Sequence, residues 1–213
     1  MRVVVFGATG RIGSRVTDEL LRRGHHVTGV VRRKRPGGKF RAPVTFVSAD
    51  ITDAESVARA VRGHDAVVSA VGPGQAEPPE VVLRSVRALL DGLRRARVSR
   101  LVVVGGAGSL ELPGGGHYLD APDFPRAGMP VALAHRAALE AYRGETELEW
   151  TYLSPAASVV PGVRTGRYRT GSDHLLTDRE GVSAISVEDL AVAIVDELET
   201  PRHLRRRFTV ASA

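Results

Sequence analysis

Three glycines at regular spacing lie between a short apolar run and an amphipathic stretch near the start of the chain. The segment 7–13 has the sequence GATGRIG, follows the apolar residues 3–6 and leads into residues 12–21. This pattern is typical of a buried strand, a tight turn and a helix N-terminus, an arrangement that binds the pyrophosphate of a dinucleotide. We expect Gly7 to allow the turn, Gly10 to leave room for the diphosphate and Gly13 to let the helix pack closely on the sheet.

The start of that helix supplies the second part of the predicted phosphate site. A helix N-terminus presents unpaired N–H groups and the positive end of the helix dipole, and both favour a phosphate. The predicted site comprises the three glycines and three of the residues between them: Gly7, Thr9, Gly10, Arg11, Ile12 and Gly13. From these residues alone, a purely structural turn between a strand and a helix remains the alternative.

Other common reaction centres have no pattern in this sequence. The chain contains no cysteine, which excludes disulfides, thiol nucleophiles and cysteine metal ligands. No His, Asp and Glu cluster has the spacing of metal ligands, and no Gly-x-Ser-x-Gly motif occurs, so we expect no metal site and no serine nucleophile of that type.

Apolar and amphipathic segments alternate along the chain at the spacing of an α/β fold. The predicted strands are residues 2–6, 26–31, 44–48, 66–70, 100–105, 149–154 and 207–210. The predicted helices are residues 12–23, 53–61, 81–97, 130–142 and 187–198. This alternation predicts a Rossmann-like, doubly wound parallel sheet in one α/β domain that spans residues 1–213.

Two stretches rich in glycine, proline and polar residues interrupt the alternation, at about 106–129 and 155–185. Both follow strands, so we expect both to leave from the carboxyl edge of the sheet, where such folds bind ligands. We interpret them as irregular walls of a substrate pocket. At the helix starts, Thr52 with Glu55 has the spacing of a capping box, and Ser186 can cap the last helix.

The net charge of +6 raises the question of a nucleic-acid partner, but only 5% of the residues are aromatic and none interleaves with the arginine groups. We therefore expect solvated arginines and no nucleic-acid partner. The chain begins with a strand and has no apolar run of about 18 residues, which predicts no signal peptide, no membrane partner and a cytoplasmic location. We expect a monomer or a small homo-oligomer.

Further motifs resemble one family nearly from end to end. They are VVVFGATGRIG at 3–13, VVSAVGPG at 67–74, GGAGSL at 105–110, DAPDFP at 120–125, LSPA at 153–156 and ISVED at 185–189. The chain is thereby similar to the short-chain dehydrogenase/reductase superfamily, in its atypical, NmrA-like branch. Within this branch it resembles bacterial proteins described as NADH-flavin reductases and, more distantly, biliverdin reductase B/flavin reductase.

The resemblance implies where a nicotinamide dinucleotide would lie. It places Asp50 and Ile51 beside the adenine and the main chain of residues 70–72 beneath the cofactor. With the later motifs, the implied cofactor contacts beyond the glycine turn are Asp50, Ile51, Ala70, Val71, Gly72, Gly105, Gly106 and Pro155.

The end of the second strand indicates which dinucleotide is preferred. NAD-binding folds usually place Asp or Glu there to hold the ribose 2′-hydroxyl, whereas this chain has a basic run, RRKR at 32–35. A guanidinium fork suits a phosphate, and the resemblance assigns the 2′-phosphate to Arg32. We therefore expect NADP(H) to be favoured over NAD(H). A solvated basic loop is the alternative.

The carbonyl-reducing pair of the superfamily, Tyr-x-x-x-Lys, is missing. The chain has two lysines, Lys34 and Lys39, and no tyrosine has a lysine four residues on. Aligned on Glu140, the lysine position holds Arg136 and the tyrosine position holds Ala132. In carbonyl reduction the pair supplies a proton to the alkoxide that forms. A conjugated ring acceptor does not need such a proton donor, because its ring system spreads the added charge.

These observations predict an NAD(P)H-dependent oxidoreductase that passes hydride to a small flavin- or quinone-like acceptor, with FMN or FAD bound as substrate. A non-catalytic, NADP(H)-binding regulator of NmrA type is the first alternative. A sugar-nucleotide epimerase or dehydratase is the second, and it is disfavoured because those enzymes use the missing pair.

Five further residues have predicted places. Ser109 is the candidate catalytic residue after the fifth strand, although Ala107 aligns with the serine position of the superfamily. His117 and Tyr118 are candidate substrate contacts in the first irregular stretch. His135 is expected on a helix surface, and Trp150 in the core.

Overall fold

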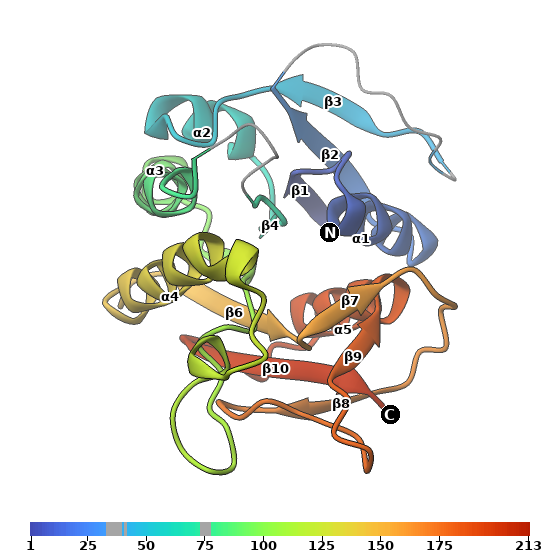
Figure 1. The fold of residues 1–213 in the computed structure, drawn as a ribbon. Coiled ribbons are helices and arrows are strands. Elements are labelled where there is room, and N and C mark those ends of the chain that lie inside the picture. Colours follow the sequence, from blue (N-terminus) through green and yellow to red (C-terminus); the bar gives the residue numbers. More distant parts are fainter. Residues whose placement is uncertain (33–39, 41, 73–77) are drawn as a thin grey trace.

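A computed structural model describes residues 1–32, 40, 42–72 and 78–213 (Figure 1). Part of the basic run after the second strand, Arg33 to Arg35, and Pro73 and Gly74 of the glycine-rich loop at 72–74 lie outside the described residues, as does Lys39.

Eight strands form the main sheet, in the order β3-β2-β1-β4-β5-β6-β10-β8. Their bounds are β1 Arg2–Phe6, β2 His26–Val31, β3 Thr45–Ser48, β4 Ala66–Ser69, β5 Arg100–Val104, β6 Glu149–Pro155, β8 Tyr168–Gly171 and β10 Arg206–Ser212. All neighbouring strands are parallel except β8, which runs antiparallel to β10. This sheet confirms the predicted Rossmann-like fold class.

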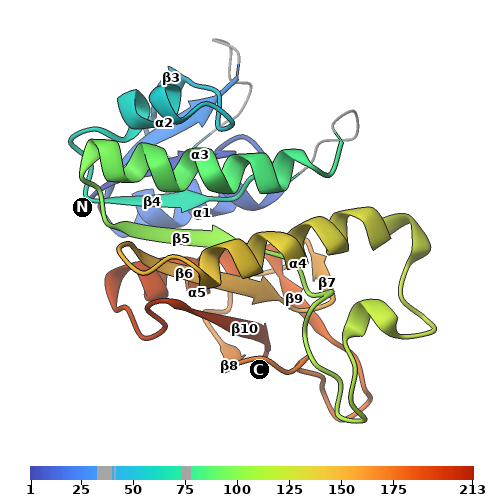
Figure 2. The same ribbon diagram turned by 90° about the vertical axis from the view of Figure 1, so that its left-hand side faces the viewer.

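Helices cover both faces of the sheet. On one face lie α1 Arg11–Arg22 and α5 Val187–Glu199, and on the other α2 Ala54–Val61, α3 Val81–Ala96 and α4 Met129–Arg143. Figure 2 shows α3 and α4 side by side in front of the sheet. Two short 3₁₀ turns, Tyr118–Asp120 and Arg126–Gly128, precede α4.

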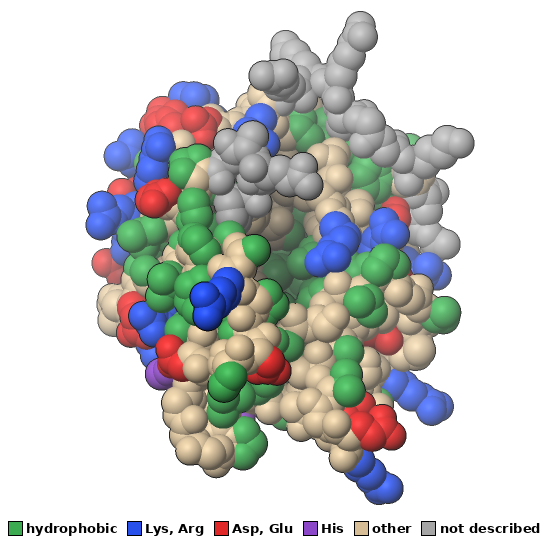
Figure 3. All heavy atoms as spheres, viewed as in Figure 1, with side chains coloured by type: hydrophobic (Ala, Val, Ile, Leu, Met, Phe, Trp, Pro, Cys, Tyr) green, Lys and Arg blue, Asp and Glu red, His purple; other side chains and the backbone are tan. Residues whose placement is uncertain are grey.

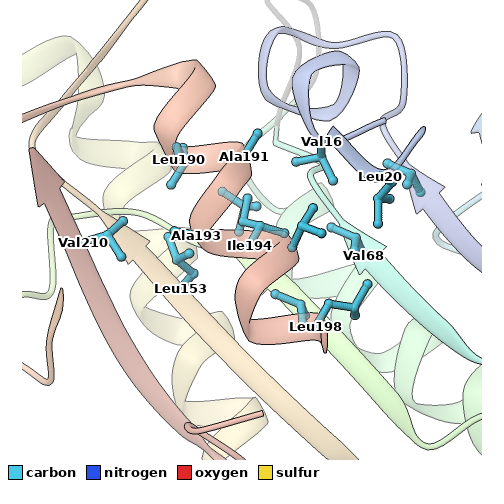
Figure 4. Packing of buried hydrophobic residues seen from close by; sticks show 14 of the residues in the cluster. Val16, Leu20, Val68, Leu153, Leu190, Ala191, Ala193, Ile194, Leu198 and Val210 are labelled. Carbon is cyan, nitrogen blue, oxygen red and sulfur yellow. The ribbon is translucent and has the colours of Figure 1, made fainter. Parts of the chain in front are cut away.

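Each face has its own apolar core. Val16 and Leu20 of α1 and Ile194 of α5 pack with the sheet residues on their side (Figure 4). On the other face the cluster includes Leu89 of α3 and Trp150 of β6, which is 1% exposed. The core position of Trp150 is therefore confirmed, and the two cores hold the sheet rigidly between the helix layers.

The cap of α2 differs from the sequence prediction. Asp53 is the N-cap residue, and its carboxylate accepts hydrogen bonds from the amides of Glu55 and Ser56 at 3.3 and 3.1 Å. Thr52 instead donates its hydroxyl hydrogen to Asp50 at 2.8 Å, so the capping box at Thr52 was wrong. The prediction for Ser186 is confirmed, because its Oγ accepts from the Asp189 amide at 3.0 Å.

The second irregular stretch contains three short strands that the sequence did not predict. They are β7 Ser158–Val160, β9 Ala184–Ser186, which pairs with β7 in a separate two-stranded sheet, and β8. The expectation of an irregular segment was wrong there because each strand has only three or four residues and no long apolar run. Their conformation depends on pairing between segments apart in sequence: β8 pairs with β10, and β7 and β9 pair with each other.

Candidate functional site

The glycine turn has the geometry that the sequence predicted. Gly7 has a φ of +77°, a left-handed conformation that side chains rarely adopt, and the Gly10 amide donates to the Gly7 carbonyl at 2.9 Å. Gly10 is also the N-cap of α1, and no side chain of the described residues caps this helix. The first amides of α1 therefore remain available to an anion.

Close packing explains the outer two glycines of the turn. A Cβ added to Gly7 would lie 2.7 Å from the Ala70 carbonyl oxygen, and one added to Gly13 would lie 2.0 Å from the Gly7 oxygen. At Gly10 the nearest atom would be 3.2 Å away, so this position has the most room. Thr9, Gly10 and Arg11 are exposed on the turn, and Ile12 is half-buried.

The ends of four parallel strands bring the predicted cofactor contacts to one edge. Phe6 pairs with Ser69, Ser69 with Val103, and Val104 with Leu153. The residues that follow these strand ends include Gly7, Ala70, Val71, Gly72, Gly105, Gly106 and, as the last residue of β6, Pro155. The strand order reverses between β1 and β4, where such folds bind ligands, and Figure 3 shows this face hollowed near its centre.

The predicted adenosine contacts meet at a corner of this edge. Asp50 accepts hydrogen bonds from the Thr52 amide and hydroxyl, both at 2.8 Å. These bonds, with weaker attraction to Arg84 and Arg32, lower the pKa of Asp50. Arg32 is exposed here, whereas the Ile51 side chain is 8% exposed and packs into the core on the α2 side.

At the other end of the carboxyl edge of the sheet, Tyr152 connects β6 with α4 and with the loop after β5. Its ring fills the space beside Gly105, where an added Cβ would lie 2.0 Å from the ring carbon Cε1. Its hydroxyl donates to the His135 carbonyl at 3.0 Å, lies 3.3 Å from His135 Nδ1 and accepts from the Gly106 amide. Burial raises the pKa of Tyr152, so the phenol stays neutral at physiological pH.

His135 was wrongly predicted to lie on the helix surface. It is partly buried against Tyr152 and Gly106, and burial lowers its pKa to about 4. The imidazole is therefore neutral at physiological pH. The helical pattern of residues 130–142 could not reveal this, because the covering ring comes from β6.

The Ser109 hydroxyl accepts a hydrogen bond from an arginine side chain. The Nη1 group of Arg207 donates to Ser109 Oγ at 3.0 Å and to its carbonyl at 2.9 Å. The same guanidinium donates from Nε to Asp173 at 2.8 Å. Arg207 thus joins the two long excursions of the chain, 106–129 and 155–185.

The structure brings Ser109 and His117 to one cavity. This cavity has a volume of about 420 Å³, and its lining also includes Glu111 and Arg136. Tyr118 instead packs edge-to-face against Phe124 with ring centroids 5.1 Å apart. Ser109 and His117 therefore share a polar pocket beside α4, and their predicted chemical roles stay predictions.

The described part of the chain contains neither a metal-binding cluster nor a membrane-spanning helix. Within residues 1–32, 40, 42–72 and 78–213, no group of three or more His, Asp or Glu side chains is arranged to hold a metal ion. In the same ranges no helix has the length and apolar character to span a membrane. The cytoplasmic location, the oligomeric state and the lack of a nucleic-acid partner stay predictions.

Comparison with known proteins agrees with this geometry. A family model described as NAD(P)H-binding matches residues 7–201. Three solved structures are similar over nearly the whole chain. A putative exported protein from Burkholderia pseudomallei is 46% identical, with a TM-score of 0.91 and 99% of each chain covered.

The other two structures have names that suggest different activities. A putative epimerase from Bacteroides thetaiotaomicron is 38% identical, with a TM-score of 0.90, 99% of this chain covered and 96% of that one. A putative NADH-flavin reductase from Streptococcus pneumoniae TIGR4 is 32% identical, with a TM-score of 0.87 and 100% of both chains covered. The shared fold and the family model support nicotinamide-cofactor binding at the glycine turn.

We predict that Gly10→Val abolishes cofactor binding and leaves the fold intact. The valine would project into the space of the pyrophosphate, while its nearest protein neighbour, the Gly7 oxygen, lies 3.2 Å from the new Cβ. NADPH fluorescence titration should show at least about a tenfold loss of affinity, or ~1.4 kcal/mol, with an unchanged circular dichroism spectrum. Gly144→Val, at the end of α4, is the control and should bind normally. Unchanged affinity in folded Gly10→Val would contradict this site.

We also predict that His135 makes the free energy of unfolding depend on pH, with a contribution that is lost in acid. Its pKa of about 4 in the folded protein lies below the ordinary 6.5, so the unfolded chain binds the proton more readily. The contribution is complete above about pH 6.5 and disappears as the pH falls towards 4. Urea unfolding should show wild type losing stability relative to His135→Gln, by at most about 1.4 kcal/mol per pH unit, across this range. A constant difference between the two proteins from pH 8 to pH 4 would refute this.

Proposed function

This chain belongs to the NAD(P)H-binding family, and we propose that it is an NAD(P)H-dependent oxidoreductase that reduces a small flavin- or quinone-like acceptor. One observation carries the choice of acceptor. The position where relatives place the proton-donating tyrosine holds Ala132, and this residue is buried. Ala132 packs closely against Gly108, because a Cβ added to that glycine would lie 2.8 Å from the Ala132 Cβ. No phenol can act from that position.

The proposed reaction needs little acid–base chemistry from the protein. The C4–H bond of the dihydronicotinamide breaks, its hydride moves to the acceptor ring, and oxidised cofactor forms. A flavin or quinone spreads the added negative charge over its ring and takes its proton from water. The protein then has to bind both partners at hydride distance and exclude competing acceptors.

The groups at the carboxyl end of β5 are consistent with this assignment. Tyr152 and His135 are neutral, and the Ser109 hydroxyl accepts a hydrogen bond from Arg207. None of these three groups is a ready proton donor to a carbonyl at physiological pH. This arrangement favours an acceptor that needs no positioned acid, and it also suits a non-catalytic, cofactor-binding regulator.

Steady-state oxidation of NADPH, followed at 340 nm, tests the proposal against its alternatives. We expect turnover with FMN, FAD or a simple quinone and none with aliphatic aldehydes or ketones, and Gly10→Val should be inactive with every acceptor. NADPH binding without oxidation by any acceptor would favour the regulator. Turnover of ketones at similar rates would overturn the proposed acceptor class.

The preference for NADP(H) depends on Arg32 in this proposal. Arg32 is exposed at the end of β2, close enough to Asp50 to lower its pKa, at the corner assigned to the adenosine. Arg32→Ala should weaken NADPH binding by about 1.5–3 kcal/mol, as for a hydrogen bond to a charged group, and affect NADH far less. Arg59→Ala, which removes an exposed arginine of α2, is the control for loss of one positive charge. Equal losses for both cofactors, measured by fluorescence titration, would mean that Arg32 does not recognise the 2′-phosphate.

A further inference from the structure

The cavity of about 420 Å³ beside α4 lies between this helix and the first long excursion of the chain, 106–129. Its α4 wall consists of one residue and those three, four, seven and ten positions after it, which share one face of a helix: Leu133, Arg136, Ala137, Glu140 and Arg143. The opposite wall comes from the excursion and from Arg207 of β10. A cavity of this volume is large enough for a small organic molecule.

This cavity is separate from the cofactor edge of the sheet. His135 faces Tyr152 and Gly106 at that edge. Arg136 is the next residue of α4, and one residue turns a helix by about 100°, so its side chain leaves the helix in a different direction. Arg207 is on β10, four strands along the sheet from β1 and its glycine turn. At about 4.8 Å between neighbouring strands, β10 lies roughly 19 Å from β1.

Two of the three arginines that line the cavity already have carboxylate partners. Arg207 donates from Nε to Asp173 at 2.8 Å. Arg143 donates to Glu140 at 2.8 Å and lies 3.5 Å from Asp173. The charges of these two guanidinium groups are therefore balanced by the protein itself.

Arg136 differs from the other two. It is half-buried, and within residues 1–32, 40, 42–72 and 78–213 no hydrogen bond or ion pair joins its side chain to another group. Glu111, in the opposite wall, lies 3.3 Å from Nε2 of His174. A guanidinium has five N–H donors, and leaving such donors without acceptors costs free energy where water is partly excluded. The cavity thus contains one cation that lacks an anion.

Ser109 supplies a second donor to the cavity. Its residue is 8% exposed, and its oxygen accepts a hydrogen bond from Arg207 Nη1 at 3.0 Å. No acceptor for the hydroxyl hydrogen itself occurs in the part of the chain that the structure describes. This hydrogen is therefore available to a ligand, and Leu133 and Ala137 add apolar surface to the same cavity.

We propose that this cavity binds a small organic monocarboxylate. The carboxylate accepts hydrogen bonds from the Arg136 guanidinium and the Ser109 hydroxyl, and the carbon skeleton packs against Leu133 and Ala137. A planar guanidinium matches a carboxylate with two parallel hydrogen bonds. One unpaired cation fits one negative charge, and the two glutamates of the lining disfavour a phosphate dianion by repulsion. The site goes beyond the proposed function, because it needs neither the cofactor nor hydride transfer.

Ligand-observed NMR titration tests the site with benzoate and with benzamide, its neutral counterpart of the same shape. Wild-type protein should bind benzoate in the millimolar range and at least about tenfold more tightly than benzamide, because only the carboxylate forms charged hydrogen bonds. Cyclohexanecarboxylate should also bind, since the site recognises the carboxylate and an apolar body. Inorganic phosphate, which has no apolar body and carries more charge, should bind more weakly than benzoate.

Three variants locate the site. Arg136→Gln should weaken benzoate binding about tenfold and leave benzamide unchanged, because it removes the charge and the fork of donors. Arg136→Lys keeps the charge without the fork, so an intermediate loss of about threefold is expected. Arg87→Gln removes an exposed arginine from the neighbouring helix α3 and should bind benzoate normally. Circular dichroism establishes that each variant is folded.

The titration also separates this site from the cofactor edge. Saturating NADP⁺ should leave the benzoate affinity within about twofold of its value without cofactor. Competition between the two ligands would place benzoate at the cofactor edge and overturn the proposal. It would equally be overturned if neither carboxylate bound at up to about 20 mM, if benzamide bound as well as benzoate, or if folded Arg136→Gln kept the wild-type affinity. Failure of the proposed reaction would leave the site standing, since the titration requires no turnover.

Discussion

The site depends on the close approach of three backbone segments around one turn. The Gly7 oxygen occupies the space that a side chain at Gly13 would need, and the Ala70 oxygen occupies the space beside Gly7. Because these positions have no Cβ, α1 can begin directly against the turn, with β4 alongside. The uncapped first amides of α1 therefore remain available at this turn, where their hydrogen bonds and the helix dipole would stabilise the phosphate of a dinucleotide.

At the other end of the carboxyl edge of the sheet, the Tyr152 side chain connects three elements. Tyr152 connects β6 with the loop after β5 through Gly106 and with α4 through His135. All the groups in this contact are neutral, since burial disfavours both the phenolate and the imidazolium. A polar but uncharged wall of this kind suits the nicotinamide and a planar ring acceptor better than a reaction that requires strong acid catalysis.

Ion pairs help to hold in place the two long segments 106–129 and 155–185. Arg164 donates twice to the buried carboxylate of Glu19 on α1, at 2.7 and 2.8 Å. Arg207 joins Ser109 of the first excursion to Asp173 of the second. Several of these charges are partly buried and multiply hydrogen-bonded, which makes such contacts stronger than exposed surface pairs. The excursion 155–185 is thereby fixed against the helix that carries the glycine turn.

Local spacing along the chain was sufficient to predict the glycine turn, the strand–helix alternation and the core position of Trp150. These features depend on residues close in sequence, whose periodicity and backbone freedom determine local structure directly. The tertiary structure alone decided the environment of His135, which Tyr152 covers from 17 residues away, and the role of the Ser109 hydroxyl, which Arg207 engages from 98 residues away. It also decided β8, a short polar segment that becomes a strand by pairing with β10. Hydrogen bonds and burial between distant segments leave no periodic signal in the sequence, so only the folded chain reveals them.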